Sequence, residues 1–223
     1  MKRFAMSLAG LTACICLYAQ TPKWDSTSRP NNYAIKVDQF RSYRDASTDF
    51  VFLGNSITAG TDWNELLGIT NARNRGISGD NTFGVLERLS EVTEGKPAKV
   101  FILIGINDVA GNKPDSVIVN NYKRIIQRIK AESPKTKIYF QTILPVNDEF
   151  EKRNHFGKDD HIAWINAELK KLGEAEKITV IDIHPLFLNA DKKLDKKYTI
   201  EGLHLNAAGY THWASILKPY LNK

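Results

Sequence analysis

Short, continuous apolar runs separated by stretches with helical spacing restrict most strongly how this chain can fold. The runs predict strands that are buried on both faces, because a strand with one face in solvent alternates apolar and polar residues. Helices of this length between such strands are typical of a parallel sheet covered on both sides, so we predict an α/β fold. The expected strands are Phe50–Leu53, a weaker one near Ala72–Arg75, Val100–Ile104, Ile138–Ile143 and Thr179–Ile183, and the expected helices are Tyr33–Tyr43, Thr82–Val92, Ser116–Ala131, His161–Gly173 and Ala207–Leu221.

The chain begins with the pattern of a secretory signal peptide. Lys2 and Arg3 precede the mostly apolar stretch Phe4–Tyr18, and Ala19 ends a small-residue cleavage pattern. The apolar stretch is too short to favour a membrane span, so no stable membrane insertion is expected. We therefore expect a signal peptide over residues 1–19 and export of the protein, to the periplasm or the medium. The other 204 of the 223 residues, 20–223, fit one domain.

A lipid anchor is the alternative for this segment. Leu11–Cys14 resembles a bacterial lipobox, which would attach a lipid to Cys14. The stretch Ile15–Ala19 stays apolar, however, and this favours cleavage and soluble export. Cys14 and Cys16 are the two cysteines of the sequence, so a cleaved chain would depend on no disulfide.

The charge pattern gives no sign of a nucleic-acid partner. The formal net charge is +6, and the lysines are scattered without an arginine stripe or interleaved aromatic residues. We interpret the lysine-rich segments as solvated surface, and we predict no nucleic-acid binding.

A serine follows the first predicted strand, and a histidine lies near the other end of the chain. Ser56 comes two residues after Gly54, and Glu201 precedes His204 by three residues. Serine, histidine and an acid are the parts of a nucleophilic hydrolase, in which the histidine activates the serine. Taken alone, Ser56 is more typical of a helix N-cap than of a nucleophile, and the G-x-S-x-G elbow of α/β-hydrolases is absent.

Two further polar segments follow predicted strands. Gly76–Thr82 holds two glycines at a strand-to-helix junction, and Asn107 follows the strand Val100–Ile104. Each is typical of an ordinary turn when taken alone. Because the carboxyl ends of parallel strands meet at one crevice, the set predicts an oxyanion hole. Its three donors would be the N–H groups of Ser56 and Gly79 and the amide of Asn107.

Together these segments resemble the SGNH hydrolases, also called GDSL-like lipases and acylhydrolases. Four blocks match in order: Leu53–Ile57, Gly76–Asp80, Gly105–Asp108 and Glu201–Asn206, the last followed by Gly209-Tyr210. The resemblance implies a three-layer α/β/α sandwich, flavodoxin-like, with about five parallel strands. It also implies a serine esterase that uses Ser56 and His204 and needs no cofactor or metal.

The chain departs from the family pattern at two positions. Asn55 stands where the family usually has aspartate before the nucleophile, and Glu201 stands where it has aspartate before the histidine. Glutamate is one methylene longer, so its carboxylate must fold back to reach the imidazole. Either Glu201 or a backbone carbonyl then orients His204, and in the second case a Ser-His dyad suffices.

The remaining histidines show no metal-ligand spacing. His155, His161 and His212 are isolated in the sequence, and His184 at the end of the last predicted strand is typical of a packed, hydrogen-bonded histidine. Asp159 and Asp160 begin a predicted helix, where carboxylates suit the helix dipole.

The sequence says least about the substrate. An exported protein of this family suggests deacetylation of glycans or other acylated carbohydrates. Trp63 is either a platform for a sugar or a core residue. The alternatives are a lysophospholipase or thioesterase that acts on longer acyl chains, and a catalytically silent glycan-binding protein with the same fold.

Overall fold

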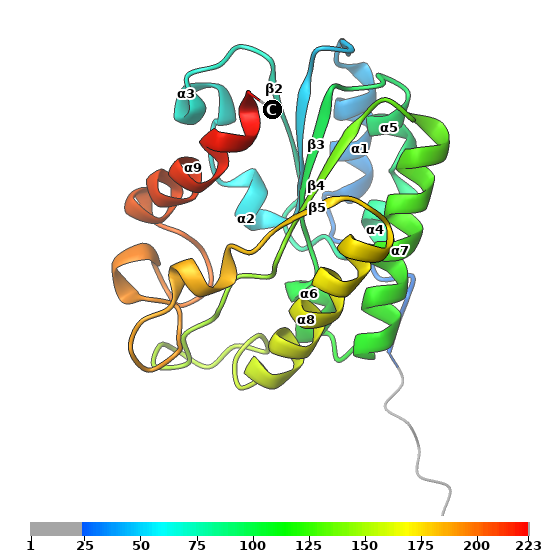
Figure 1. The fold of residues 1–223 in the computed structure, drawn as a ribbon. Coiled ribbons are helices and arrows are strands. Elements are labelled where there is room, and N and C mark those ends of the chain that lie inside the picture. The colour runs from blue at the N-terminus through cyan, green and yellow to red at the C-terminus, as the bar shows by residue number, and fades with distance from the viewer. Residues whose placement is uncertain (1–23, 223) are drawn as a thin grey trace, which may run out of the picture.

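A five-stranded parallel sheet forms the centre of the molecule (Figure 1), in a computed structural model that describes residues 24–222. The strand order is β2-β1-β3-β4-β5, and every pairing is parallel. This order is that of flavodoxin-like sheets, in which the chain reverses direction across the sheet between β1 and β3. The predicted three-layer α/β/α fold is confirmed.

The elements lie close to the predicted ranges. The strands are β1 (Phe50–Gly54), β2 (Ala72–Gly76), β3 (Lys99–Leu103), β4 (Lys137–Gln141) and β5 (Thr179–Ile181). The helices are α1 (Tyr33–Ser42), α2 (Ser56–Ala59), α3 (Trp63–Leu67), α4 (Thr82–Glu87), α5 (Ser90–Thr93), α6 (Ile106–Ala110), α7 (Asp115–Glu132), α8 (Asp159–Ala175) and α9 (Ala207–Leu221), with short 3-10 turns at His184–Phe187 and Lys196–Tyr198.

Helices cover both faces of the sheet because the central strands are apolar on both sides. All five residues of β3 are buried, and so are the last four of β1. In Figure 1, α3 and α9 lie against one face, and α1, α4, α5 and α7 lie against the other, with α8 beside α7. The long helix α7 shows the expected pattern, because its buried residues recur at three- and four-residue spacing: Ile118, Tyr122, Ile125, Ile126 and Ile129.

The single helix expected over Thr82–Val92 is wrong. The chain forms α4, leaves helical geometry at Arg88 and resumes as α5 at Ser90. The side chain of Arg88 turns inward and is fully buried, where it meets two carboxylates. Apolar and polar residues keep their helical spacing across this break, so the sequence pattern alone does not show it.

Trp63 is a core residue rather than a sugar platform. Its side chain is 1% exposed and stacks on Phe52 with ring centroids 4.0 Å apart. Its indole N–H donates to the Thr58 carbonyl oxygen. The tryptophan therefore holds α3 on the sheet, and it is closed to a ligand.

The expected signal peptide, residues 1–19, and Cys14 lie outside the described residues. Over residues 24–222, no helix combines the length and apolar character that crossing a bilayer requires.

Candidate active site

The site lies where the chain order reverses between β1 and β3, at the carboxyl ends of these strands. Ser56 opens α2 directly after β1, and Asn107 is the second residue of α6 after β3. The two strands are adjacent and in register, with Gly54 opposite Leu103. Open α/β sheets bind ligands at this position because the loops on either side separate there.

Asn55, not Ser56, caps the helix that follows β1. The Asn55 side-chain oxygen accepts a hydrogen bond from the Ile57 N–H at 3.0 Å. The cap role considered for the serine is therefore already filled, and the serine hydroxyl is available for another contact. That hydroxyl lies 2.9 Å from Nε2 of His204, a residue 148 positions away in the sequence.

Glu201 reaches the other ring nitrogen of His204. One carboxylate oxygen lies 2.6 Å from Nδ1 and also accepts the His204 backbone N–H at 3.0 Å. A carboxylate accepts, so Nδ1 carries the proton and Nε2 is left as an acceptor for the Ser56 hydroxyl. The extra methylene of glutamate is accommodated, and the arrangement can pass a proton from serine to histidine.

The loop that carries this pair is folded by contacts with its own neighbours. Thr199 and Leu205 form an antiparallel bridge, and the Thr199 hydroxyl donates to the His204 carbonyl oxygen at 2.7 Å. Gly202 has φ +85, and a Cβ there would run into the carbonyl oxygen of Asn147. Only glycine allows this turn to lie so close to the loop after β4.

Tyr210 joins the histidine loop to the serine helix. Its hydroxyl donates to the Ile57 carbonyl oxygen at 2.9 Å, and a Cβ at Gly60 would collide with that hydroxyl. Burial raises the pKa of Tyr210 to about 12, and the charge of Glu201 adds to the shift. The tyrosine therefore stays neutral and holds the start of α9 against α2.

The three predicted oxyanion donors belong to adjacent segments. Asn107 Nδ2 donates to the Asp80 carbonyl oxygen at 2.8 Å, which places the amide beside the segment that contains Gly79. Gly79 has φ +79, in the left-handed region that suits glycine. Within residues 24–222, no acceptor pairs with the backbone N–H of Ser56 or of Gly79. Both groups are thus available to a ligand.

A buried ionic network holds the segment that contains Gly79 and Asp80 in place. Arg88 donates to Asp80 at 2.9 Å and to Glu91 at 2.7 Å, and all three side chains are fully buried. The same guanidinium donates to the backbone oxygens of Gly54 and Arg75, the first of which lies two residues before Ser56. One side chain therefore ties together the first two sequence blocks.

Asp108 supports the third block. Its carboxyl group accepts the Thr82 N–H at 2.9 Å and the Thr82 hydroxyl at 2.7 Å, and this links the start of α4 to α6. Burial raises the pKa of Asp108 to about 6, although the bonds from Thr82 oppose the shift.

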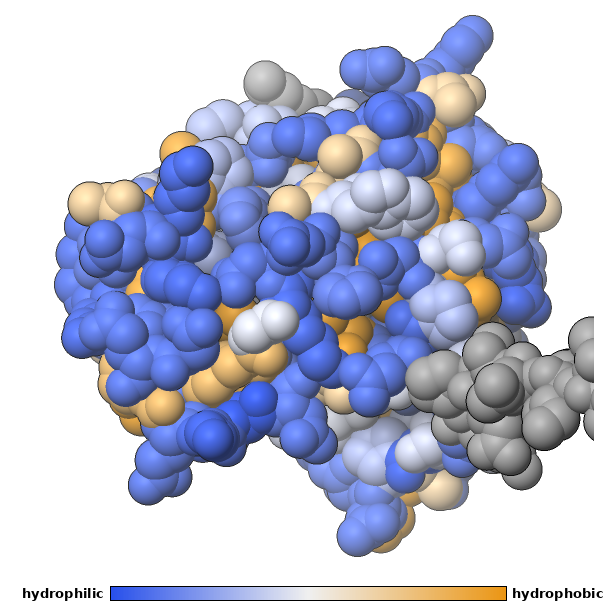
Figure 2. All heavy atoms as spheres, turned by 90° about the horizontal axis from the view of Figure 1, so that it is seen from below, coloured by the Kyte–Doolittle hydropathy of each residue, from blue (hydrophilic) through white to orange (hydrophobic). Residues whose placement is uncertain are grey.

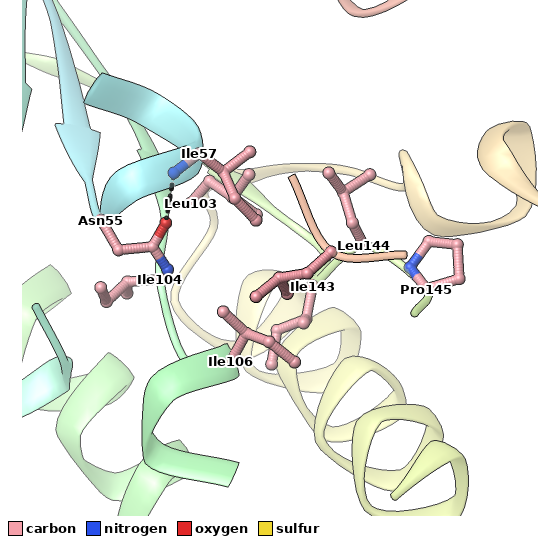
Figure 3. Close-up of a pocket in the computed structure, with 9 residues that line it drawn as sticks. Asn55, Ile57, Leu103, Ile104, Ile106, Ile143, Leu144 and Pro145 are labelled. Carbon is pink, nitrogen blue, oxygen red and sulfur yellow. Dashed lines mark hydrogen bonds between the residues drawn. The ribbon is translucent and has the colours of Figure 1, made fainter. Parts of the chain in front are cut away.

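A small apolar hollow lies beside the turn that carries Ser56 (Figure 3). It is lined by the neighbours of Ser56 in the sequence, Asn55 and Ile57, together with Leu203 and residues that follow β3 and β4. Its volume is about 10 Å³, which is room for roughly one water molecule.

Sequence reasoning missed His155, which it treated as an isolated histidine. His155 lies on the loop before α8, and its Nε2 is 3.0 Å from Asn107 Oδ1, 48 positions away in the sequence. No local pattern could have revealed this contact, because it depends on the path of the loop.

The other polar residues have structural contacts. His184 Nδ1 lies 2.8 Å from the Ile143 carbonyl oxygen, as expected for a packed histidine. Asp159 and Asp160 lie in the first turn of α8, as predicted, and Asp159 pairs with Lys193. No group of three or more His, Cys, Asp or Glu residues in the described part of the chain could hold a metal ion.

Known proteins resemble this chain in both sequence and fold. Residues 52–212 match the model of the GDSL-like Lipase/Acylhydrolase family. Rat platelet-activating factor acetylhydrolase IB subunit alpha2 is 29% identical over 183 residues, which cover 79% of this chain and 76% of that protein.

Two solved structures superpose on most of the chain. One, from Streptococcus pneumonia and named for platelet activating factor, has 29% identity and a TM-score of 0.77, and the match covers 85% of this chain and 92% of that one. The other, a GDSL-like lipase from Bacteroides thetaiotaomicron, has 25% identity and a TM-score of 0.75, with 86% and 97% covered. The family match spans the blocks that contain Ser56, Gly79, Asn107 and His204. The chain therefore belongs to the GDSL-like lipase/acylhydrolase family of SGNH hydrolases and is a carboxylic ester hydrolase.

Proposed function

We propose that this carboxylic ester hydrolase is an exported serine esterase that removes small acyl groups, above all acetyl, from the hydroxyl groups of carbohydrates. The observation that carries the proposal is the chain of contacts from the Ser56 hydroxyl to His204 and on to Glu201, at 2.9 and 2.6 Å. The residues are in the order that nucleophile, base and orienting acid require.

The proposed reaction is acyl transfer to water. His204 takes the proton of Ser56, whose oxygen attacks the ester carbonyl carbon. The N–H groups of Ser56 and Gly79 and the amide of Asn107 stabilise the oxyanion that forms. His204 then protonates the departing alcohol, and a water molecule releases the acid from Ser56 by the same steps.

Two features support a small acyl group. The apolar hollow beside the turn that carries Ser56 has a volume of about 10 Å³, which is far too small for a long acyl chain. The rat relative is named an acetylhydrolase. These features favour acetyl esters over the substrates of a long-chain lysophospholipase or thioesterase.

The surface around the strand ends supports a polar alcohol. In the view from that side, hydrophilic residues cover most of the face, and apolar residues are scattered between them (Figure 2). A carbohydrate presents hydroxyl groups that such a surface can bind, whereas a long-chain lipid needs a continuous apolar path.

The test is acetate release from acetylated xylan, acetylated sialic acid and p-nitrophenyl acetate, with p-nitrophenyl palmitate as the long-chain comparison. We expect the protein to release acetate and Ser56→Ala to lose turnover while keeping its fold by circular dichroism. The matched control is Ser215→Ala, which removes an exposed hydroxyl on α9 and should leave turnover unchanged.

Three outcomes would contradict parts of the proposal. Full activity of Ser56→Ala would remove the nucleophile assignment. Faster cleavage of the palmitate ester would favour the long-chain alternative. Glycan binding without acid release would favour the silent binding protein. Mass analysis of the mature protein tests the export step, because cleavage after Ala19 leaves Gln20 at its N-terminus.

A further inference from the structure

His155 contacts the proposed oxyanion hole from a loop that is firmly attached to it. The loop lies between β4 and α8 and is fastened to the end of α6 by Lys158. The Lys158 ammonium donates to the carbonyl oxygens of Val109 and Ala110 at 2.7 and 3.1 Å. Since α6 also carries Asn107, His155 and the amide it contacts belong to one packed unit.

The two neighbours of the Asn107 amide determine which way it faces. The carbonyl oxygen of Asp80 can only accept, so the group that faces it at 2.8 Å must be the NH₂ of Asn107. The amide oxygen then faces His155 Nε2 at 3.0 Å, and that nitrogen must donate. The flipped orientation is excluded because it would place the amide oxygen against the Asp80 carbonyl oxygen, and two acceptors cannot form a hydrogen bond. One N–H of the amide is used by Asp80, and within residues 24–222 the second N–H of Asn107 meets no acceptor, so it can donate to an oxyanion.

The surroundings of His155 favour the neutral ring with its proton on Nε2. Its Nδ1 is buried and has no hydrogen-bond partner within residues 24–222. A second proton there would be an unpaired buried N–H. Burial is the main cause that lowers the pKa of His155, and the nearby charges of Arg153 and Lys158 lower it further, while the charge of Glu201 opposes them.

We propose that His155 is a positioning residue, which holds the Asn107 amide with its free N–H directed at the oxyanion through a neutral Nε2–H donor. The inference builds on the proposed esterase function. The effect of His155 falls on the transition state, because the oxyanion develops there, whereas the ester oxygen in the ground state carries little charge.

The test compares His155→Leu, which has no donor, with His155→Gln, whose amide can donate from nearly the same place. In the full chain with p-nitrophenyl acetate, His155→Leu should lower kcat tenfold to a hundredfold, below the ~10²–10³-fold cost of losing an oxyanion donor outright. KM should change by less than about twofold. His155→Gln should recover most of the loss. The control His161→Leu changes an exposed histidine paired with Asp115 and should leave both constants unchanged.

A double-mutant cycle separates positioning from a general structural effect. If His155 acts through Asn107, then His155→Leu should cost nothing further in the Asn107→Ala background. Additive losses, a raised KM with unchanged kcat, or wild-type kinetics of His155→Leu would each overturn the inference. If Ser56→Ala and Asn107→Ala also keep full activity, the proposed function itself fails, and this result is distinct.

A spectroscopic measurement covers the case in which His155→Leu does not fold. Ring ¹⁵N shifts of the wild-type protein should show His155 as the neutral Nε2–H tautomer at pH 7. Either the Nδ1–H tautomer or a charged ring would overturn the inference.

Discussion

The two halves of the candidate site are built by different means. One, which we call the nucleophile half after the proposed nucleophile Ser56, follows the ends of β1, β2 and β3. It is supported by Arg88, whose four hydrogen-bond partners are all buried. The histidine half is the loop 199–206, in which the side chains of Glu201 and His204 are 22% and 36% exposed. Several of its contacts join residues no more than six positions apart, such as Thr199 and His204, and the Asn147 N–H ties it to the rest of the molecule through the Gly202 carbonyl oxygen at 2.9 Å.

This difference indicates how variants should behave. Changes beneath the nucleophile half should reduce the free energy of unfolding, because they leave buried charges without partners. Changes of the reactive side chains in the histidine half should reduce turnover and leave stability almost unaffected, because these side chains are partly solvated.

Changes of the reactive side chains in the histidine half should have the largest effect on activity. We expect His204→Ala to lower kcat by about 10⁴-fold or more, and Glu201→Gln to approach that loss because an amide can stabilise the wrong tautomer of His204. Thermal unfolding of both variants should match the wild type. A loss under about tenfold for Glu201→Gln would instead indicate a Ser-His dyad.

Loss of the buried guanidinium should have the largest effect on stability. Arg88→Leu leaves Asp80 and Glu91 buried without their shared partner and should lower the free energy of unfolding by about 3–5 kcal/mol. Urea denaturation measures this change, with Lys171→Ala as the control because its ion pair with Glu168 is largely exposed. Equal stability of the two variants would contradict the division between the halves.

A buried carboxyl group should give the nucleophile half a pH-dependent stability. The pKa of Asp108 is raised from 3.8 to about 6, so the folded state holds this proton more tightly than the unfolded state. The stabilisation of the folded state by protonated Asp108 is therefore fully present below about pH 4 and is lost as the pH rises through about 6. Asp108→Asn should flatten the fall in melting temperature over this window. An unchanged slope would assign the pH dependence to other groups.

Removal of the hydrogen bond by which Tyr210 joins the two halves should have the smallest effect. Tyr210→Phe removes the hydrogen bond to the Ile57 carbonyl oxygen and should cost about 1 kcal/mol of stability, with a modest fall in kcat. Tyr43→Phe, at a tyrosine that is 49% exposed, is the matched control. A loss of kcat as large as that of His204→Ala would show that the two halves depend on this one bond for their alignment.

The sequence predicted the fold well because its signals are local. Continuous apolar runs predicted all five strands to within two residues at either end, and helical spacing predicted α1, α7, α8 and α9. The prediction failed at Arg88, where a helical pattern hides a charged residue that turns into the core. Trp63 was ambiguous for a related reason, since exposure is a property of the packed molecule.

The order of the elements along the chain, and the four blocks that contain Ser56, Gly79, Asn107 and His204, follow from the sequence alone. Periodicity and short motifs are properties of neighbouring residues, so they can be read without coordinates. Four contacts could be known from the folded molecule alone. Asn55 rather than Ser56 caps α2, Ser56 faces His204, Glu201 reaches His204 Nδ1, and His155 contacts Asn107. These contacts depend on the path of a turn or on side chains from segments far apart in the chain, and packing sets both.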